Sequence, residues 1–121
     1  MKETIDTVEY ASLLYDFYGD LLDEGKREVM DLYHGDDLSL TEIAEEMNMT
    51  RQGVHYILKK AENTLERYEE RLGLIRRWQE NRVLGEKALA AAESLLASKE
   101  LDEEQRSKIA FLRETVRQLT E

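Results

Sequence analysis

The first third of the chain is patterned as two helices. Apolar residues recur at spacings of three and four in residues 7–19, which predicts a first helix there. Asp23 is placed to cap a second helix, which Gly35 and the two aspartates after it end. The apolar face of the first helix is expected to comprise Tyr10, Leu13, Leu14, Phe17 and Leu21. The inward-facing residues of the second are expected to be Val29, Met30, Leu32 and Tyr33.

Two further helices follow in the middle of the chain. Ser39 and Glu42 form a capping box, in which the serine accepts from the Glu42 amide and the glutamate reaches back. This predicts a short third helix, Leu40–Met47. Thr50 is placed to cap a fourth helix, Arg51–Leu72.

The C-terminal part is patterned as a helical hairpin that starts after a boundary at Gly73. A long helix over residues 74–97 and a last helix capped by Asp102 are joined by the short segment 98–100, so the two are expected to run antiparallel. The apolar positions of the long helix are Leu74, Ile75, Trp78, Leu84, Ala88, Leu95 and Leu96. Those of the last helix are Ile109, Leu112, Val116 and Leu119.

The third and fourth helices match a helix-turn-helix position by position. Ala44 is small where the two helices must cross, and Asn48 stands at the turn position that needs a left-handed residue. Ile43, Val54 and Ile57 are expected to form the apolar core between the helices. The spacing of these residues predicts the motif.

Composition supports an all-α protein. Proline is absent over 121 residues, good helix formers are abundant, and no alternating apolar run resembles a strand. Cysteine is also absent, which excludes disulfides and thiolate chemistry. Residues 1–6 lack the apolar stretch of a signal peptide, and no run is long enough to cross a membrane. A cytoplasmic protein that does not enter the membrane is expected.

The charge is unevenly distributed along the chain. Residues 1–72 hold eight basic and 18 acidic residues, a net charge of −10, whereas residues 73–121 hold nine of each. The acidic excess therefore coincides with the helix-turn-helix. Because affinity for nucleic acid requires several neutralised phosphates, tight binding of DNA by one such domain is disfavoured.

The fourth helix nevertheless begins with a basic segment. Residues 47–61 contain three basic side chains and no acidic one. Arginine and glutamine suit base edges and lysine suits phosphates, so this face is a candidate for contact with nucleic acid or an acidic partner; ordinary solvated polar residues are the alternative. The residues expected on it are Arg51, Gln52, His55, Tyr56, Lys59 and Lys60.

A second basic cluster surrounds Trp78, near the start of the long helix. Packing of the tryptophan in the core with solvated arginines is the interpretation we favour. The alternative is a surface for RNA or an acidic partner, with the tryptophan as a stacking anchor. The arginines are Arg71, Arg76, Arg77 and Arg82.

Enzymatic chemistry finds no support in these residues. His34 and His55 have no carboxylates at spacings that would make either a metal ligand or a catalytic base. Asp31, Asp36 and Asp37 lack the spacing of a calcium-binding loop. No glycine-rich phosphate loop is present. A protein without enzymatic activity, cofactor or metal is therefore expected.

Three stretches carry a resemblance to a known family. They read Leu-Tyr-Asp-Phe-Tyr-Gly-Asp-Leu-Leu at residues 14–22, Asp-Asp-Leu-Ser-Leu-Thr-Glu-Ile-Ala-Glu-Glu at 36–46 and Arg-Gln-Gly-Val at 51–54. Residues 22–65 resemble region 4 of bacterial sigma factors. The aromatic-rich first stretch makes residues 10–72 more similar to the YlxM-like family of small bacterial proteins, from which Thr50 and Gly53 depart only mildly.

The resemblance implies a fold and a cellular pathway. The fold is a sigma region 4-like, winged-helix-like helix-turn-helix domain over residues 1–72. The helical hairpin over residues 73–121, which is expected from its own pattern, is assigned to dimerisation or partner binding. The pathway is that of the signal recognition particle, in which the protein is expected to bind the particle's GTPase or its RNA. Fold alone does not fix such a function.

Two other functions stay open. One is a transcriptional regulator that reads a palindromic DNA site with the helix starting at Arg51. The other is an adaptor that binds only proteins. A homodimer is expected in either case, because the apolar residues of the two C-terminal helices exceed what one hairpin needs.

Overall fold

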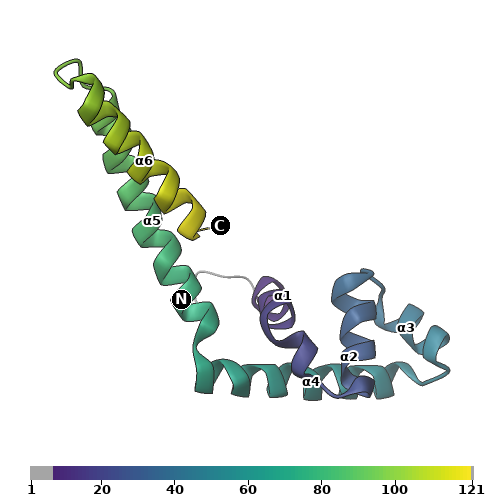
Figure 1. The fold of residues 1–121 in the computed structure, drawn as a ribbon. Helices are drawn as coiled ribbons and strands as arrows, with labels where there is room; N and C mark the ends of the chain where they lie inside the picture. Colours follow the sequence, from purple (N-terminus) through teal and green to yellow (C-terminus); the bar gives the residue numbers. More distant parts are fainter. Residues whose placement is uncertain (1–6, 121) are drawn as a thin grey trace. The chain divides into compact units, whose positions relative to one another are not determined.

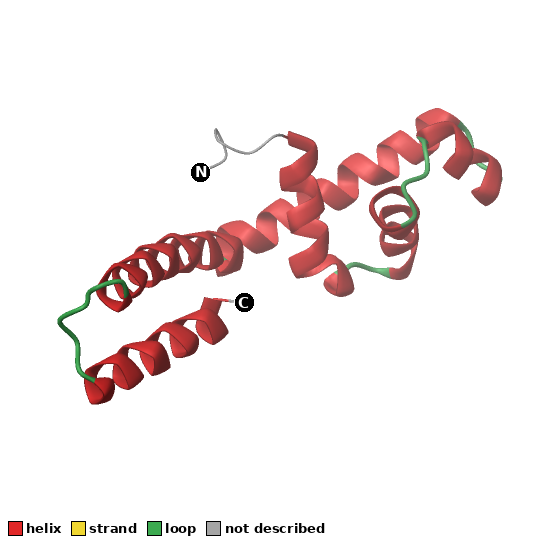
Figure 2. Ribbon diagram, turned by 90° about the horizontal axis from the view of Figure 1, so that it is seen from above, coloured by secondary structure: helices red, strands yellow, loops and turns green. Residues whose placement is uncertain are grey.

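The computed structural model describes residues 7–120 and shows helices joined by short loops (Figure 1). In chain order these are α1 (Thr7–Tyr18), the 3-10 helix η2 (Gly19–Leu21), α2 (Glu24–Met30), the π-helix η3 (Asp31–Gly35), α3 (Leu40–Met47), α4 (Arg51–Leu72), α5 (Leu74–Leu96) and α6 (Glu103–Thr120). Residues 7–120 contain no strand (Figure 2), so the expected all-α class is confirmed and the helix-turn-helix is the version without a β wing.

Two compact units make up the chain, with the division between Ile75 and Arg76, inside α5. Gly73, the boundary expected from the sequence, ends α4 in the left-handed conformation, at φ 63°. Among the described helices, none has the length and apolarity that a bilayer crossing requires. Residues 1–6, in which a signal peptide was not expected, lie outside the described part.

Side-chain caps define where the helices begin. Asp23 accepts from the Lys26 amide at the start of α2. At α3 both halves of the Ser39–Glu42 capping box are formed, as the sequence predicts. At α6, Asp102 accepts from the Gln105 amide while the Gln105 side chain accepts from the Asp102 amide. Because these caps satisfy backbone donors that a helix leaves unpaired, local sequence fixes these helix starts.

In the first unit α1, α2 and α3 each pack against α4, which forms the floor of the core (Figure 1). Apart from the Tyr18 phenol, no side chain with a polar or charged group is fully buried among the described residues. The buried core residues are Leu14, Tyr18, Leu22, Val29, Met30, Ile43, Ala44, Val54, Leu58, Ala61, Leu65 and Ile75.

One expected core position is wrong, and another is only partly buried. Leu21 is 57% exposed and its neighbour Leu22 is buried. Helical backbone ends at Leu21 and Leu22 is extended, with φ −74° and ψ 151°, so helical spacing no longer decides which of the two side chains faces inward. Ile57 lies only half-buried at the edge of the core, and Leu58 takes the fully buried place.

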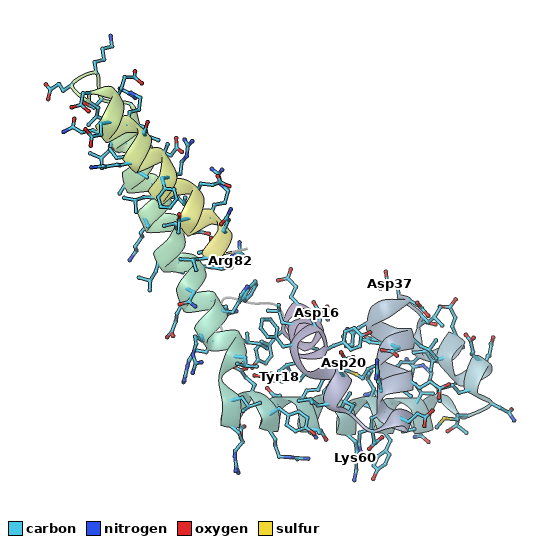
Figure 3. All side chains as sticks on the ribbon, in the orientation of Figure 1. Asp16, Tyr18, Asp20, Asp37, Lys60 and Arg82 are labelled. Carbon is cyan, nitrogen blue, oxygen red and sulfur yellow. The ribbon has the colours of Figure 1, made fainter. Side chains whose placement is uncertain are left out.

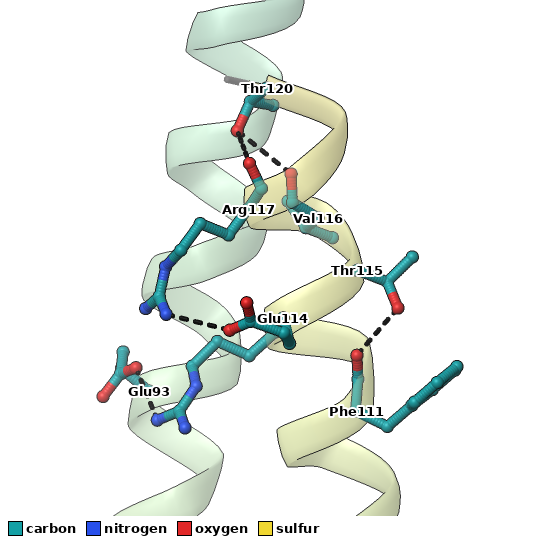
Figure 4. A network of polar contacts seen from close by, with 8 residues as sticks. Glu93, Phe111, Glu114, Thr115, Val116, Arg117 and Thr120 are labelled. Atoms are coloured by element: carbon teal, nitrogen blue, oxygen red, sulfur yellow. Dashed lines mark hydrogen bonds and ion pairs between the residues drawn. The ribbon is translucent and has the colours of Figure 1, made fainter.

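The second unit is a hairpin of α5 and α6. Gly85 is buried where an added Cβ would collide with Cγ2 of Thr120, so the glycine allows the two helices to approach closely. Arg106 donates to the carbonyls of Leu96 and Ser98, and Arg113 pairs with Glu93 at 3.0 Å (Figure 4). The expected antiparallel pair is therefore formed.

The apolar stripe expected on α6 is split between two faces. Ile109 and Val116 are half-buried, as expected, whereas Leu112 and Leu119 are 58% and 79% exposed. Leu84 and Leu95 of α5 are likewise exposed. Within residues 76–120 no large apolar side chain is fully buried, because two helices alone cover each contact residue from one side only.

Candidate nucleic-acid interface

The turn between α3 and α4 has the geometry that the sequence predicts. Asn48 adopts the left-handed conformation, with φ 56° and ψ 50°, and the Met49 amide donates to the Ala44 carbonyl at 2.8 Å. The Thr50 hydroxyl then accepts from the Gly53 amide at 2.9 Å and starts α4. These contacts hold the two helices in the predicted helix-turn-helix arrangement.

The exposed face of the first three turns of α4 carries all six residues expected on it. They form two rows of residues four apart in the helix, and every member is exposed, whereas Val54 and Leu58 on the opposite side are buried. Lys60 lies at the surface of the first unit on α4 (Figure 3). We call this surface the α4 face; its residues are Arg51, Gln52, His55, Tyr56, Lys59 and Lys60.

The charges of the α4 face are only partly compensated. Lys59 lies 3.6 Å from Glu62, one turn further along the helix. The Lys60 ammonium lies 5.2 Å from the centre of the Tyr56 ring, a cation–π contact that holds both side chains at the surface. The first turn of α4 has no acidic residue, so its N-terminus keeps its positive potential.

The structure adds Lys26 to this surface. A shallow groove of about 270 Å³ runs between the start of α2 and α4, and Lys26, Tyr56 and Lys60 line it together with Asp23. Lys26 is 30 residues before Tyr56, so no local pattern in the sequence links them. The Lys26 ammonium forms an ion pair with Asp23 at 2.8 Å.

The outward face of α3 is acidic. Glu42, Glu45 and Glu46 are exposed beside Thr41, and α3 carries no basic residue. In a helix-turn-helix bound to duplex DNA the first helix crosses the phosphate backbone, so these carboxylates would meet phosphates. The exposed side of α3 is therefore negative, whereas the α4 face is positive.

The second basic cluster is divided between the two units. Arg71 is exposed on α4 in the first unit, and Arg76, Arg77 and Arg82 are exposed on α5 in the second. The Arg82 guanidinium lies 5.1 Å from the centre of the half-buried Trp78 ring. A base that stacks on this tryptophan would have to share the ring with Arg82.

His34 lies among aromatic rings away from the α4 face. It stacks on Tyr15 at 5.6 Å and meets the edge of Tyr33 at 4.9 Å. Burial lowers its pKa below the ordinary 6.5. Its Nε2 atom is buried without a hydrogen-bond partner among the described residues. The described residues hold no cluster of three or more histidine and carboxylate side chains suited to a metal ion.

The sequence matches a family of known proteins. The model of the family UPF0122, described as a "helix-turn-helix protein, YlxM / p13 like", matches residues 5–108. The chain belongs to the UPF0122 family. The resemblance drawn from the three sequence stretches is thereby confirmed, and a helix-turn-helix family supports a nucleic-acid-binding regulatory role.

The relatives in the UPF0122 family match part of this chain. A UPF0122 protein of Desulforamulus reducens is 54% identical over 76 residues, which is 62% of this chain and 65% of the relative. One of Thermoanaerobacter sp. is 49% identical over 75 residues, 62% of this chain and 64% of the relative. A UPF0122 protein of Listeria innocua is 39% identical over 94 residues, which is 78% of this chain and 82% of the relative. The match thus spans just under two thirds of the first two relatives.

Proposed function

We propose that this chain is a non-enzymatic regulatory protein that acts as an accessory factor of the signal recognition particle. Its α4 face binds the particle's RNA, and the GTPase of the particle is the alternative target. The pathway rests on the resemblance to the YlxM-like proteins. The single observation that supports nucleic acid as the ligand is the grouping of Arg51, Gln52 and Lys60 on one exposed helix face.

Charge and shape favour RNA over duplex DNA as the ligand. Duplex DNA presents two phosphate strands, and one of them would approach the acidic residues Glu45 and Glu46 of α3. A single-stranded RNA loop needs only the α4 face, where Tyr56 is 61% exposed and an unpaired base can stack on its ring beside Lys60. Arg51 then supplies a charge for the phosphates at the start of the helix.

The test is a binding measurement with matched charge reversals. Fluorescence anisotropy of the particle's RNA, with a scrambled RNA of equal length, compares the wild type with Arg51→Glu/Lys60→Glu. The control variant is Lys99→Glu/Arg117→Glu, which makes the same charge change on α6 and the loop before it. Loss of about tenfold or more in affinity only for the α4 variant supports the proposal. Equal loss in both variants contradicts it.

A crosslinked pull-down from the cells of origin tests the pathway itself. Enrichment of the particle's RNA or GTPase supports the accessory role, and a change in GTP turnover when the purified protein is added identifies the GTPase as the target. Recovery of neither component, with unchanged turnover, contradicts the role in this pathway.

A transcriptional regulator is the second candidate, and the geometry of the turn favours it. The turn presents Gln52 and His55 on the exposed face of α4, as a recognition helix presents base-reading side chains. Gln52→Ala/His55→Ala then relaxes base preference, and affinity falls steeply as salt rises. Enrichment of defined promoter DNA in the same pull-down selects this function.

A further inference from the structure

The hairpin of α5 and α6 has one charged face and one apolar face. The less exposed residues of α5 follow the row Gly85, Leu89, Ala92 and Leu96, with spacings of four, three and four. Those of α6 follow Ile109, Arg113, Val116 and Thr120. This is the spacing of a coiled-coil seam, so these two rows form the contact within the hairpin.

A second seam runs beside the first, and it is largely exposed. On α5 it comprises Leu84, Ala88, Ala91 and Leu95, each one residue before a member of the first row. On α6 the corresponding row is Lys108, Leu112, Thr115 and Leu119, of which only the threonine is half-buried. In an antiparallel pair the residues that precede each contact row fall on the same side of the hairpin, so both rows line one face.

The opposite face is polar. It carries Glu86 and Glu93 of α5 with Glu114 and Arg117 of α6, and the last two form an ion pair at 3.0 Å (Figure 4). Phe111, which is 71% exposed, points away from α5 in the same view. The hairpin is therefore amphipathic as a whole, and among the described residues of the second unit nothing covers its apolar face.

We propose that this apolar face binds a second copy of the chain, with the two α5 helices antiparallel about a two-fold axis that passes between Ala88 and Ala91. Leu84 then packs against Leu95 of the second copy, and Ala88 against Ala91. This interface does not depend on the proposed RNA or GTPase target.

The symmetry of the exposed seam identifies the occupant. Its order is leucine, alanine, alanine, leucine at spacings of four, three and four, which reads the same from either end. An isologous interface demands such self-complementarity, because a residue contacts its counterpart across the axis. The alanines at the centre allow close approach of the helices, and the leucines fill the space at both ends.

Charge and size also fit a second copy. Residues 76–121 carry nine basic and nine acidic residues, so two hairpins do not repel each other. Lys108 is the one basic residue in the two exposed rows, whereas nucleic acid or an anionic membrane requires several. Helices about 30 Å long and about 10 Å wide give the hairpin a face on the order of 600 Å² in projection. Specific dimers bury roughly 800 Å² of accessible surface per partner, a comparable area.

The small buried core of the hairpin also favours a second copy as the partner. Within residues 76–120 no large apolar side chain is fully buried, while Leu84, Leu95, Leu112 and Leu119 are all more than half exposed. The smaller a folded unit, the smaller the share of its surface that folding buries, and this chain has no cysteine for a disulfide. A four-helix bundle made from two hairpins supplies the missing core.

Light scattering of the full chain with two neighbouring substitutions tests the interface. The wild type at tens of micromolar is expected at about 28 kDa, twice the 14.2 kDa of one chain. Ala91→Glu places a carboxylate in the seam and raises the dimer Kd by about 30-fold or more. The matched control Ala90→Glu makes the same change on the next residue, also exposed but off the seam, and leaves the mass unchanged. Circular dichroism confirms that both stay helical.

Crosslinking tests the direction of the helices. The double variant Leu84→Cys/Leu95→Cys is expected to form disulfide-linked dimers on oxidation, whereas each single variant does not. Crosslinking of the single variants indicates parallel helices and overturns the proposed arrangement. A wild type that is monomeric at 100 µM, or equal effects of Ala90→Glu and Ala91→Glu, overturns the interface itself.

Discussion

The hydroxyl of Tyr18 donates a hydrogen bond to Oε1 of Glu69, 2.5 Å away, and so joins α1 to the last turns of α4. The same hydroxyl accepts from the Leu74 amide at 3.1 Å, and Oε1 of Glu69 also accepts from the Ile75 amide at 3.0 Å. The first amides of a helix have no partner within it. Tyr18 and Glu69 therefore cap α5 with side chains from two other helices.

Removal of the Tyr18 hydroxyl is expected to destabilise the first unit. Tyr18→Phe keeps the buried ring but leaves Glu69 and the Leu74 amide without this partner, which lowers the free energy of unfolding by about 1–3 kcal/mol. Urea unfolding followed by circular dichroism measures the change. Tyr56→Phe, at an exposed tyrosine, is the control and changes stability by less than about 0.5 kcal/mol. Similar values for both variants contradict the capping role.

The same hydroxyl predicts a loss of stability in alkali. Burial and the bond to Glu69 raise the pKa of Tyr18 from 10.0 to about 12. Between these values the unfolded chain releases the proton while the folded chain keeps it, so the contribution is present below pH 10 and is lost as the pH rises to 12. Unfolding free energy measured across this range falls more steeply in the wild type than in Tyr18→Phe, which retains the similarly raised Tyr15. Parallel curves would be the contrary result.

His34 predicts a pH dependence of opposite sign. Burial lowers its pKa, against a smaller opposing attraction from Glu62 and Asp16. A lowered pKa in the folded state gives stability that is present above 6.5 and lost as the pH falls toward the folded value. His34→Phe keeps an aromatic ring against Tyr15 without titrating. Its unfolding free energy is expected to fall less than that of the wild type between pH 7 and 5, and an NMR titration that gives His34 a pKa above 6.5 refutes the argument.

Asn48 is expected to be replaceable by glycine but not by alanine. Its left-handed conformation strains most side chains, and asparagine tolerates it. Asn48→Ala lowers the free energy of unfolding by about 1 kcal/mol, while Asn48→Gly leaves it unchanged or slightly raised. Thermal unfolding of the two variants measures the difference. Equal melting temperatures for Asn48→Ala and Asn48→Gly contradict a conformational role for this residue.

The carboxylates of α3 are expected to weaken nucleic-acid binding. Glu45→Gln/Glu46→Gln removes two negative charges beside the α4 face and leaves Glu42, which caps α3, in place. Affinity for duplex DNA is expected to rise several-fold at low salt and by less at high salt, because the repulsion is screened. The control Glu100→Gln/Glu103→Gln, in the second unit, leaves affinity unchanged. Anisotropy titrations at two salt concentrations decide between these results.

The elements of the first unit are largely predictable from the sequence because their signals are local. The Ser39–Glu42 capping box, the Thr50 cap and the left-handed Asn48 act within four residues, so the sequence predicts the turn and the face that α4 exposes. Helical spacing alone also predicts that the six residues of the α4 face are exposed, because it separates them from Val54 on the buried side.

Only the tertiary structure decided which apolar residues are covered. Leu22, in the extended backbone after the 3-10 turn, is buried in place of Leu21, and the Tyr18–Glu69 bond joins residues 51 apart. In the hairpin, periodicity shows that Leu112 and Leu119 are apolar positions, yet the close approach of α6 at Gly85 selects Ile109 and Val116 for the contact. The sequence by itself determined helices, caps and turn, because these depend on neighbours in the chain. Burial depends on which distant helix comes close, and that required the folded structure.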